Sequence, residues 1–335
     1  MADDGIAFDG ASAAAGPLGG AETAFVGLAE ALAARGHRVI AGSRCRAPLT
    51  HNGVEWAPID SGVPADCDLY IGNRSHRVIG LCPGARRRLF WIHNPGRYLR
   101  KPRNVVPLAR HRPTIVVSGG VHARTVPAWL PRRRLEIVPY GVQEIFRRAA
   151  PRRPPPPVAV FTSNPLRGLD WLLDLWVKRI ASVVPGAELH VYAGPAVYGG
   201  AGGGRMNDVL ARADTLHESG VRRFPPVGRN ALADVLGKAR VMLYRGDPGE
   251  TFCLAVAEAQ AMGLPAVVQP LGSLGERVTD GISGRVACTD EAFAEAAIAV
   301  LRDDEAWRRW HLGALTTRRG LSWDEVAGRF EALMQ

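Results

Sequence analysis

Short apolar segments alternate with longer helical patterns along nearly the whole chain. In the first half the apolar segments include GIAFDG, HRVIAG, DLYIGN, RRLFWIHN and TIVVSGG, and AETAFVGLAEALAARG has the spacing of a helix. The alternation resumes later with VAVFTS, LDWLLDLWVKRIASVV, ELHVYAG and RVMLYRG. Strands that alternate with helices predict parallel sheets in an α/β fold. Two such blocks predict two doubly wound, Rossmann-like domains facing across a cleft.

A run of four prolines marks the clearest break in this pattern. It lies in the segment Ala150–Val158, and such a run favours an extended spacer. A chain of 335 residues is also long for one core and suits two domains of about 150 residues each. We therefore predict an N-terminal domain over 1–150, a C-terminal domain over 151–320, and a last helix over 321–335 that packs back towards the first domain.

Composition indicates a soluble globular protein. Hydrophobic residues make up 47% and charged residues 22%, and no apolar run approaches the ~20 residues that cross a bilayer. The beginning MADDGIAFDG lacks the basic and apolar regions of a secretory signal. Five scattered cysteines without a Cys-x-x-Cys pair are typical of reduced thiols. We expect a cytoplasmic protein.

The net charge of +10 is unevenly distributed. Residues 1–150 contain 21 basic and 11 acidic side chains, whereas residues 151–335 contain 21 of each. Between Asp68 and Glu136 there are 15 basic residues and no acidic one. A field of this kind attracts nucleic acid, an anionic membrane surface or a ligand that carries phosphate.

The segment GETFCLAVAEAQAMG contains two glutamates in an otherwise apolar helical pattern. Glu250 is predicted at the mouth of the helix and Glu258 eight residues later, about 12 Å along the axis, so both can face one cleft. The neighbours of Glu258 are apolar, and we expect its replacement by alanine to leave the fold intact. The preceding strand and the turn Gly246–Gly249 direct the free N–H groups of the helix towards the cleft, a seat for phosphate. The spacing suits a nucleotide sugar.

These residues resemble the Glu-x7-Glu signature of retaining glycosyltransferase family 4, which has the two-domain GT-B fold. The resemblance extends to the Gly263–Pro265 segment that follows, and it covers nearly the whole chain. It implies that Glu250 lies beside the donor sugar and that Glu258 binds the ribose. A buried helix with one capping and one edge glutamate is the alternative, which the flanking strand, turn and Gly-x-Pro make less favoured.

Other segments resemble the family to different degrees. Gly19 and Gly20 precede the first helix, as the glycine loop of the family does. Arg167 occupies the family's lysine position on the donor diphosphate, whereas Ser163 or Asn164 replaces its arginine. His93 ends an apolar run where the family has a histidine for the donor sugar. Weaker candidates are Asn73, Arg74 and Ser118 at strand ends, and Gly141 next to Tyr140 is the candidate hinge.

We therefore assign the candidate site as follows. The catalytic candidates are Glu250, His93 and Arg167. The donor-binding candidates are Glu258, Gly19, Gly20, Thr251, Phe252, Cys253, Leu254, Asn164 and Gly249. The candidates for contact with an acceptor or a membrane are Arg86, Arg87, Arg88, Arg97, Arg100, Lys101 and Arg103.

No metal or other cofactor is expected. Asp66-Cys67-Asp68 reads as the Asp-x-Asp of metal-dependent glycosyltransferases, but we predict that it precedes a strand, whereas that motif should follow one. No His, Cys and Glu cluster has ligand spacing for another metal. Arg167 and the helix start at Phe252–Val256 are then expected to stabilise the leaving diphosphate.

The resemblance implies a retaining transfer of a hexose-type sugar from a UDP- or GDP-linked donor. The basic first half favours an anionic or lipid-linked saccharide as acceptor, in bacterial surface polysaccharide or glycoconjugate biosynthesis, with peripheral contact at the cytoplasmic membrane. Two alternatives stay open at this point. One is a GT-B sugar-nucleotide epimerase, and the other is a basic polyanion- or nucleic-acid-binding protein, disfavoured because the charge is spread over several segments.

Overall fold

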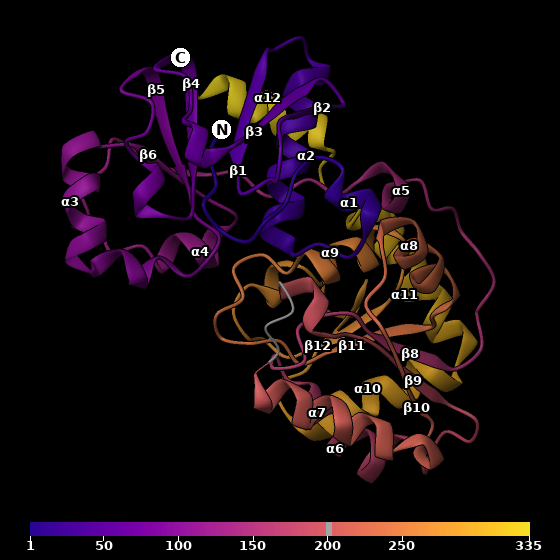
Figure 1. Ribbon diagram of the computed structural model, residues 1–335. Helices are drawn as coiled ribbons and strands as arrows, with labels where there is room; N and C mark the ends of the chain where they lie inside the picture. Colours follow the sequence, from indigo (N-terminus) through magenta and orange to yellow (C-terminus); the bar gives the residue numbers. More distant parts are fainter. Residues whose placement is uncertain (199–202) are drawn as a thin grey trace. The chain divides into compact units, whose positions relative to one another are not determined.

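The computed structural model describes residues 1–198 and 203–335, and the chain forms two compact units (Figure 1). The first unit contains Met1–Gly141 and Leu321–Gln335, and the second contains Val142–Gly320. The boundary predicted at residue 150 is therefore wrong. The polyproline run lies inside the second unit because the chain enters that unit earlier, where Phe146 is fully buried in its core.

The first unit is built on two sheets joined by the first residues of the chain. The strands are β1 (Val39–Ser43), β2 (Leu49–His51), β3 (Val54–Pro58), β4 (Asp66–Asn73), β5 (Gly84–Trp91), β6 (Thr114–Val117) and β7 (Leu135–Ile137). They form the orders β1-β3-β2 and β4-β5-β6-β7, parallel except for β2. Ala2 bridges Gly42 of β1 and Gly72 of β4 in parallel, so Ala2 has the place of the first strand. The prediction of a strand in GIAFDG is wrong, since residues 5–7 are bends, residues 8 and 9 have no regular structure and residue 10 is part of a turn.

The first unit also contains five α-helices and three short 3-10 helices. They are α1 (Ser12–Ala15), α2 (Gly20–Ala34), α3 (Pro102–His111), α4 (Gly120–Arg124) and α12 (Trp323–Ala332), with short 3-10 helices η1 (Ile59–Ser61), η2 (His76–Val78) and η3 (Gly96–Arg100). Figure 1 shows the yellow helix α12 among the indigo elements of this unit, and α12 packs on α2. A capping box at Ser322 starts α12, and Arg35 forms ion pairs with Asp324 and Glu331 of this helix, each over 2.8 Å.

The second unit contains one six-stranded parallel sheet. Its strands are β8 (Val158–Phe161), β9 (Glu188–Tyr192), β10 (Val221–Phe224), β11 (Val241–Tyr244), β12 (Ala266–Val268) and β13 (Gly284–Val286). Their spatial order is β10-β9-β8-β11-β12-β13. In chain order this is 3-2-1-4-5-6, the strand order of the Rossmann fold, with its switch point between β8 and β11. The doubly wound sheet predicted from the alternating pattern is confirmed here.

Helices cover the sheet of the second unit and bury its strands. They are α5 (Glu144–Arg147), α6 (Leu169–Leu175), α7 (Gly204–Thr215), α8 (Arg229–Lys238), α9 (Leu254–Ala261), α10 (Asp290–Arg302) and α11 (Asp304–Thr317), with the π-helical turn η4 (Trp176–Ile180) and the 3-10 helices η5 (Pro195–Tyr198), η6 (His217–Ser219) and η7 (Leu274–Glu276). All four residues of β11 are fully buried, as a strand covered on both faces requires. In the part of the chain that the structure describes, no helix combines the length and apolar character needed to span a membrane.

Candidate active site

The candidate site of the second unit lies where β8 and β11 end next to each other. The strand order reverses between these two strands. The turn after β8 contains Asn164 and Arg167, and the loop after β11 contains Glu250. Because both strands are parallel, the two connections leave from the same edge of the sheet. Doubly wound sheets bind ligands in this crevice, outside the carboxyl ends of the strands.

Arg167, Glu250 and Tyr244 form a hydrogen-bonded cluster at the crevice. Nη1 of Arg167 lies 2.5 Å from Oε1 of Glu250, and the Tyr244 hydroxyl donates to the same oxygen over 2.5 Å. The Oγ of Ser163 donates to the Tyr244 oxygen over 3.2 Å. The side chain of Glu250 is 4% exposed, whereas that of Arg167 is 40% exposed. The carboxylate is thus enclosed, and the guanidinium is open enough for its other N–H groups to reach a ligand.

The protonation states in this cluster follow from burial and charge. Burial raises the pKa of Tyr244 well above 10, and the neighbouring Cys253 and Glu250 raise it further, so the phenol is a neutral donor. Burial alone would lower the pKa of Arg167, but Glu250 and Tyr244 outweigh it and the pKa is raised. Arg167 is therefore a permanent cation at the crevice. Sequence reasoning missed Tyr244, although a phenol that ends an apolar strand is a usable signal.

Glu250 precedes helix α9 and does not lie in its first turn, so this part of the prediction is wrong. The helix begins at Leu254. An Asp247 turn comes before it: Oδ1 of Asp247 accepts from the N–H of Gly249 over 2.7 Å, and its carbonyl accepts from the N–H of Glu250 over 2.9 Å. Cys253 then has a φ of 64°, a left-handed conformation that no helix continues through. The two glutamates are consequently not spaced along one helix.

Most of the remaining donor-binding candidates are packed residues. The whole run Thr251–Leu254 is buried. The ring of Phe252 lies against the guanidinium of Arg277, 4.2 Å from its carbon to the ring centroid. Oδ1 of Asn164 accepts from the N–H of Leu166 over 2.9 Å and closes the turn after β8. Their side chains shape the loops, and any ligand contact from the run Thr251–Leu254 would come chiefly from its backbone.

Glu258 is buried in an ion pair with Arg229, the first residue of α8. The Glu258 side chain is 3% exposed and that of Arg229 13% exposed. Nε of Arg229 also donates to Oε1 of Gln143 over 3.0 Å, and its guanidinium lies 4.7 Å from the ring centroid of Phe146. Burial lowers the pKa of Arg229 to about 10, so it is still charged at neutral pH. Sequence reasoning missed this arginine, which makes Glu258 part of the packing as well as a candidate ligand contact.

His93 lies at the carboxyl end of β5 in the first unit, and both ring nitrogens have partners. Nε2 is 2.5 Å from Oδ1 of Asn73, and Nδ1 contacts the hydroxyl of Tyr140. The amide oxygen of Asn73 only accepts, so Nε2 carries the proton and Nδ1 accepts from the phenol. Burial, then the charges of Arg74 and His122, lowers the His93 pKa well below 6.5. A sugar hydroxyl would have to replace one of these partners.

Arg74 is held in an ion-pair cluster beside this histidine. Its guanidinium lies 2.8 Å from Asp3 and 2.7 Å from Glu22. Glu22 belongs to the first turn of α2, which Gly19 caps and Gly20 begins. The predicted glycine loop therefore leads into a helix start that is fixed by Arg74. The stretch of uncompensated charge seen in the sequence is broken here, because carboxylates from elsewhere in the chain neutralise this arginine.

Ser118, which follows β6, is engaged with a second buried histidine. Its Oγ lies 3.0 Å from Nδ1 of His122, and its N–H donates to that nitrogen over 3.2 Å. Nε2 of His122 donates to the carbonyl of Asn94 over 2.9 Å. Burial lowers the His122 pKa to about 4, so this ring is neutral at physiological pH.

The basic residues assigned to an acceptor or membrane lie at different ends of one strand. Arg86–Arg88 lie in the amino half of β5, whereas Arg97 and Arg100 belong to η3, after its carboxyl end. Lys101 and Arg103 follow directly and are exposed. Arg88 and Arg86 lie three and five residues before the end of β5, about 10 and 17 Å at the usual rise of a strand, so the seven residues fall into two groups along the strand.

The Asp66-Cys67-Asp68 sequence is the start of β4 itself, not a segment before the strand as predicted, and both carboxylates are exposed. Asp68 pairs with Arg86 over 2.9 Å. Within residues 1–198 and 203–335, no group of three or more His, Cys, Asp or Glu side chains is arranged to hold a metal ion.

Comparison with known proteins gives a family match for the second unit. Residues 156–303 match the family model described as "Glycosyl transferases group 1". Two curated relatives are D-inositol 3-phosphate glycosyltransferases. That of Xylanimonas cellulosilytica is 36% identical over 137 residues, 39% of this chain and 32% of the relative, and that of Kribbella flavida is 30% identical over 221 residues, 64% and 51% respectively. The chain thus spans about half or less of the length of these relatives.

Solved structures show the same fold over nearly the whole chain. Sucrose-phosphate synthase from Thermosynechococcus elongatus aligns with a TM-score of 0.76 at 15% identity, covering 98% of this chain and 97% of that one. Alr3699/HepE from Anabaena, solved with UDP and glucose, aligns with a TM-score of 0.69 at 13% identity, covering 94% and 95%. The predicted GT-B fold, with two Rossmann-like units, is confirmed. The matches together support the GT-B glycosyltransferase superfamily.

Proposed function

We propose that the protein is a retaining, metal-independent glycosyltransferase that moves a hexose-type sugar from a UDP- or GDP-linked donor. The observation that supports this most is the Arg167–Glu250 pair at the β8–β11 switch point, where a cation is open to a ligand and a carboxylate is fixed beside it. The match to a glycosyltransferase family model spans this region, and a structural neighbour was solved with UDP-glucose.

In this proposal the donor diphosphate lies on Arg167, and Glu250 is oriented towards the sugar. Charge-assisted hydrogen bonds of about 1.5–3 kcal/mol would stabilise the leaving diphosphate. In front-face retention, the bond from the anomeric carbon to the phosphate oxygen breaks while the acceptor oxygen attacks from the same side. The phosphate oxygen that leaves takes the proton of the acceptor hydroxyl. Glu258 is assigned to the ribose and neutral His93 to the donor sugar.

The acceptor is proposed to be an anionic or lipid-linked saccharide of a bacterial surface polymer or glycoconjugate, at the cytoplasmic face of the membrane. Support comes from the excess of basic residues in residues 1–150. Arg97, Arg100, Lys101 and Arg103 are exposed near the carboxyl end of β5, the edge at which His93 lies. Each basic residue near an anionic leaflet contributes about 1 kcal/mol, which gives reversible and salt-sensitive attachment.

A panel of nucleotide sugars tests the proposal, with release of the nucleoside diphosphate followed in the presence of bacterial lipid and polysaccharide extracts. We expect one donor to be consumed only when an acceptor fraction is present. Conversion of a nucleotide sugar to its epimer without any acceptor would favour the epimerase instead. Binding of duplex DNA with no response to UDP or GDP would favour the polyanion-binding alternative.

A further inference from the structure

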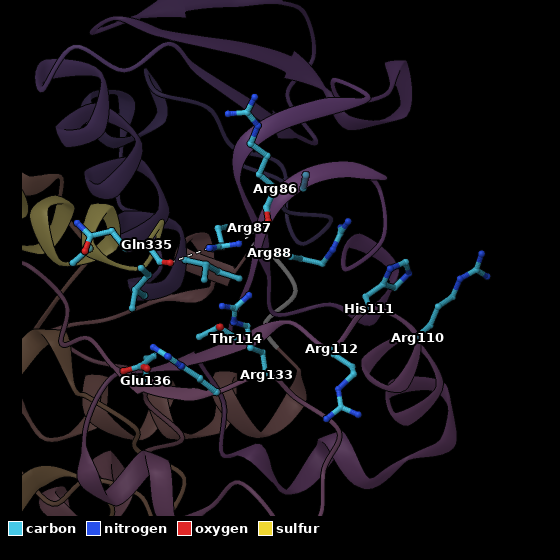
Figure 2. Close-up of a pocket in the computed structure, with 15 residues that line it drawn as sticks. Arg86, Arg87, Arg88, Arg110, His111, Arg112, Thr114, Arg133, Glu136 and Gln335 are labelled. Carbon is cyan, nitrogen blue, oxygen red and sulfur yellow. Dashed lines mark hydrogen bonds between the residues drawn. The ribbon is translucent and has the colours of Figure 1, made fainter.

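A polar cavity lies at the edge of the first unit's sheet opposite to the edge near His93. It has a volume of about 310 Å³ and is lined by the amino half of β5, the end of α3, the segments before β6 and β7, and the last residues of the chain. Since β5, β6 and β7 are parallel, this is the amino edge of the sheet, whereas His93 follows the carboxyl end of β5. We call this cavity the amino-edge pocket; Figure 2 shows its lining residues.

The lining of the amino-edge pocket is strongly basic. Glu136 is its one carboxylate side chain among the lining residues, beside His111 and seven arginines: Arg86, Arg87, Arg88, Arg110, Arg112, Arg133 and Arg134. Like charges gathered around one cavity repel one another unless an anion is present. The set comes from three separate segments of the chain, so it is assembled by the fold and is not a simple run of arginines.

Three of these arginines are already fixed, and four are available. Arg86 pairs with Asp68 over 2.9 Å, Arg87 donates to the main-chain oxygen of the last residue, Gln335, over 2.9 Å, and Arg88 donates to two carbonyls over 2.7 and 2.6 Å. Within the described part of the chain, the side chains of the other four form no hydrogen bond or ion pair: Arg110, Arg112, Arg133 and Arg134. Their guanidinium groups are thus free to bind a ligand.

His111 lies among the arginines of the pocket. Figure 2 shows its ring between Arg88 and Arg110. Burial, followed by the charges of these two arginines, lowers the pKa of His111 from its usual value. Arg88 is half-buried with carbonyl partners and the ring of Tyr70 at 5.4 Å, so its cation is held in a fixed position without a carboxylate. Both features favour a bound anion in the pocket.

We propose that the amino-edge pocket binds a compact ligand that carries two or more phosphate groups. Guanidinium forks bind phosphate oxygens in pairs, and several forks around a small concave cavity suit clustered phosphates. The lining contains no Phe, Tyr or Trp on which a nucleic-acid base could stack. A soluble diphosphate and a phosphorylated lipid headgroup share this chemistry. The site is independent of the proposed glycosyl transfer, because it lies at the other edge of the sheet from the candidate residues of the first unit.

Calorimetry with inorganic pyrophosphate tests the proposal in the Arg167→Met background, which removes the cation of the proposed donor site. We expect one pyrophosphate per chain, with the affinity about tenfold or more lower after Arg133→Ser/Arg134→Ser and after Arg110→Ser. The matched control Arg44→Ser/Arg46→Ser removes two exposed charges of the same unit outside the pocket and should bind as the parent does. No binding by the parent, or an equal loss in the control, would overturn the proposal. Thermal unfolding checks that each variant is folded.

Vesicle sedimentation separates the two sources of the phosphate groups. Vesicles of phosphatidylcholine with cardiolipin, whose headgroup carries two phosphates, are compared with vesicles of phosphatidylglycerol at equal total charge. Preferred recovery with cardiolipin, displaced by pyrophosphate and lost in Arg133→Ser/Arg134→Ser, would assign the pocket to a lipid headgroup. Pyrophosphate binding without that preference would assign it to a soluble ligand. Cardiolipin recovery that neither pyrophosphate nor the pocket variant reduces would contradict the proposed pocket.

Discussion

Nη1 of Arg167 lies 2.5 Å from Oε1 of Glu250, although the two residues are 83 positions apart in the chain. The strand order of the second unit causes this contact, because β8 and β11 are neighbours and both end at the same edge of the sheet. The pair combines an open cation with an enclosed carboxylate. The proposal that a donor diphosphate and its sugar bind here depends on this relationship.

Tyr244 holds the carboxylate of Glu250 in place, so Tyr244→Phe should slow turnover without weakening nucleoside diphosphate binding. One lost hydrogen bond to a charged group corresponds to a decrease of about tenfold or somewhat more in kcat. Glu250→Gln should reduce kcat further, again with unchanged diphosphate affinity. Tyr192→Phe on β9 is the matched control. A Tyr244→Phe variant with normal kcat would show that this hydrogen bond does not position Glu250.

Glu258→Ala should destabilise the second unit by about 3–5 kcal/mol, since it leaves Arg229 buried and unpaired. This reverses the sequence-based expectation of an intact fold. Urea unfolding of Glu258→Ala, Arg229→Met and the double variant measures the coupling, and the double variant should recover much of the loss. The exposed pair Arg223–Asp214 is the control, where Arg223→Met should cost about 0–1 kcal/mol. Equal costs at both pairs would contradict the buried ion pair.

The first unit should lose stability as the pH falls below about 6.5. His93 and His122 are buried and neutral, and their pKa values are lowered, that of His122 to about 4. In the unfolded chain they bind protons below about pH 6.5, so the free energy of unfolding decreases by about 1.4 kcal/mol per pH unit for each histidine. Above about pH 6.5 both rings are neutral in the folded and the unfolded protein, so the free energy of unfolding no longer depends on their protonation. For His122 the decrease in the free energy of unfolding ends near pH 4, its pKa in the folded protein.

Urea unfolding at pH 7.5 and 5.0 measures this dependence. His122→Gln should reduce the change in the free energy of unfolding between the two pH values by the contribution of one histidine. His217→Gln, on the surface of the second unit, should leave that change as it is in the parent. A free energy of unfolding that is the same at both pH values would show that these rings are not kept neutral by the fold.

Transfer activity should survive EDTA if Arg167 replaces a metal at the leaving diphosphate. The measurement is nucleoside diphosphate release after incubation and dialysis with the chelator. Activity that is abolished and then restored by Mn²⁺ or Mg²⁺ would contradict metal independence and make Asp66 and Asp68 the candidate metal ligands. The variants Asp66→Asn and Asp68→Asn would test that role.

The sequence was sufficient for the fold class, because the alternating apolar segments determine parallel sheets. The sequence was less informative about features that depend on contacts between distant parts of the chain. Ala2 acts as a strand only because β1 and β4 bond to it on both sides, a pairing that no local pattern indicates. The helix expected at Glu250 begins later because an aspartate turn and the left-handed Cys253 precede it. Partners such as Tyr244 and Arg229 come from other strands and helices, so spacing alone could not find them.

Calorimetric titration with UDP and GDP tests the central proposal most directly. It compares the parent with Arg167→Met, both in the Arg133→Ser/Arg134→Ser background so that the amino-edge pocket does not contribute, and Arg179→Met is the matched control on the same unit. We predict that one of the two nucleotides binds to the parent and the control, and that Arg167→Met weakens this binding by about 10- to 100-fold. Equal affinity in Arg167→Met and the parent, or no binding of either nucleotide, would contradict a diphosphate site at the Arg167–Glu250 pair.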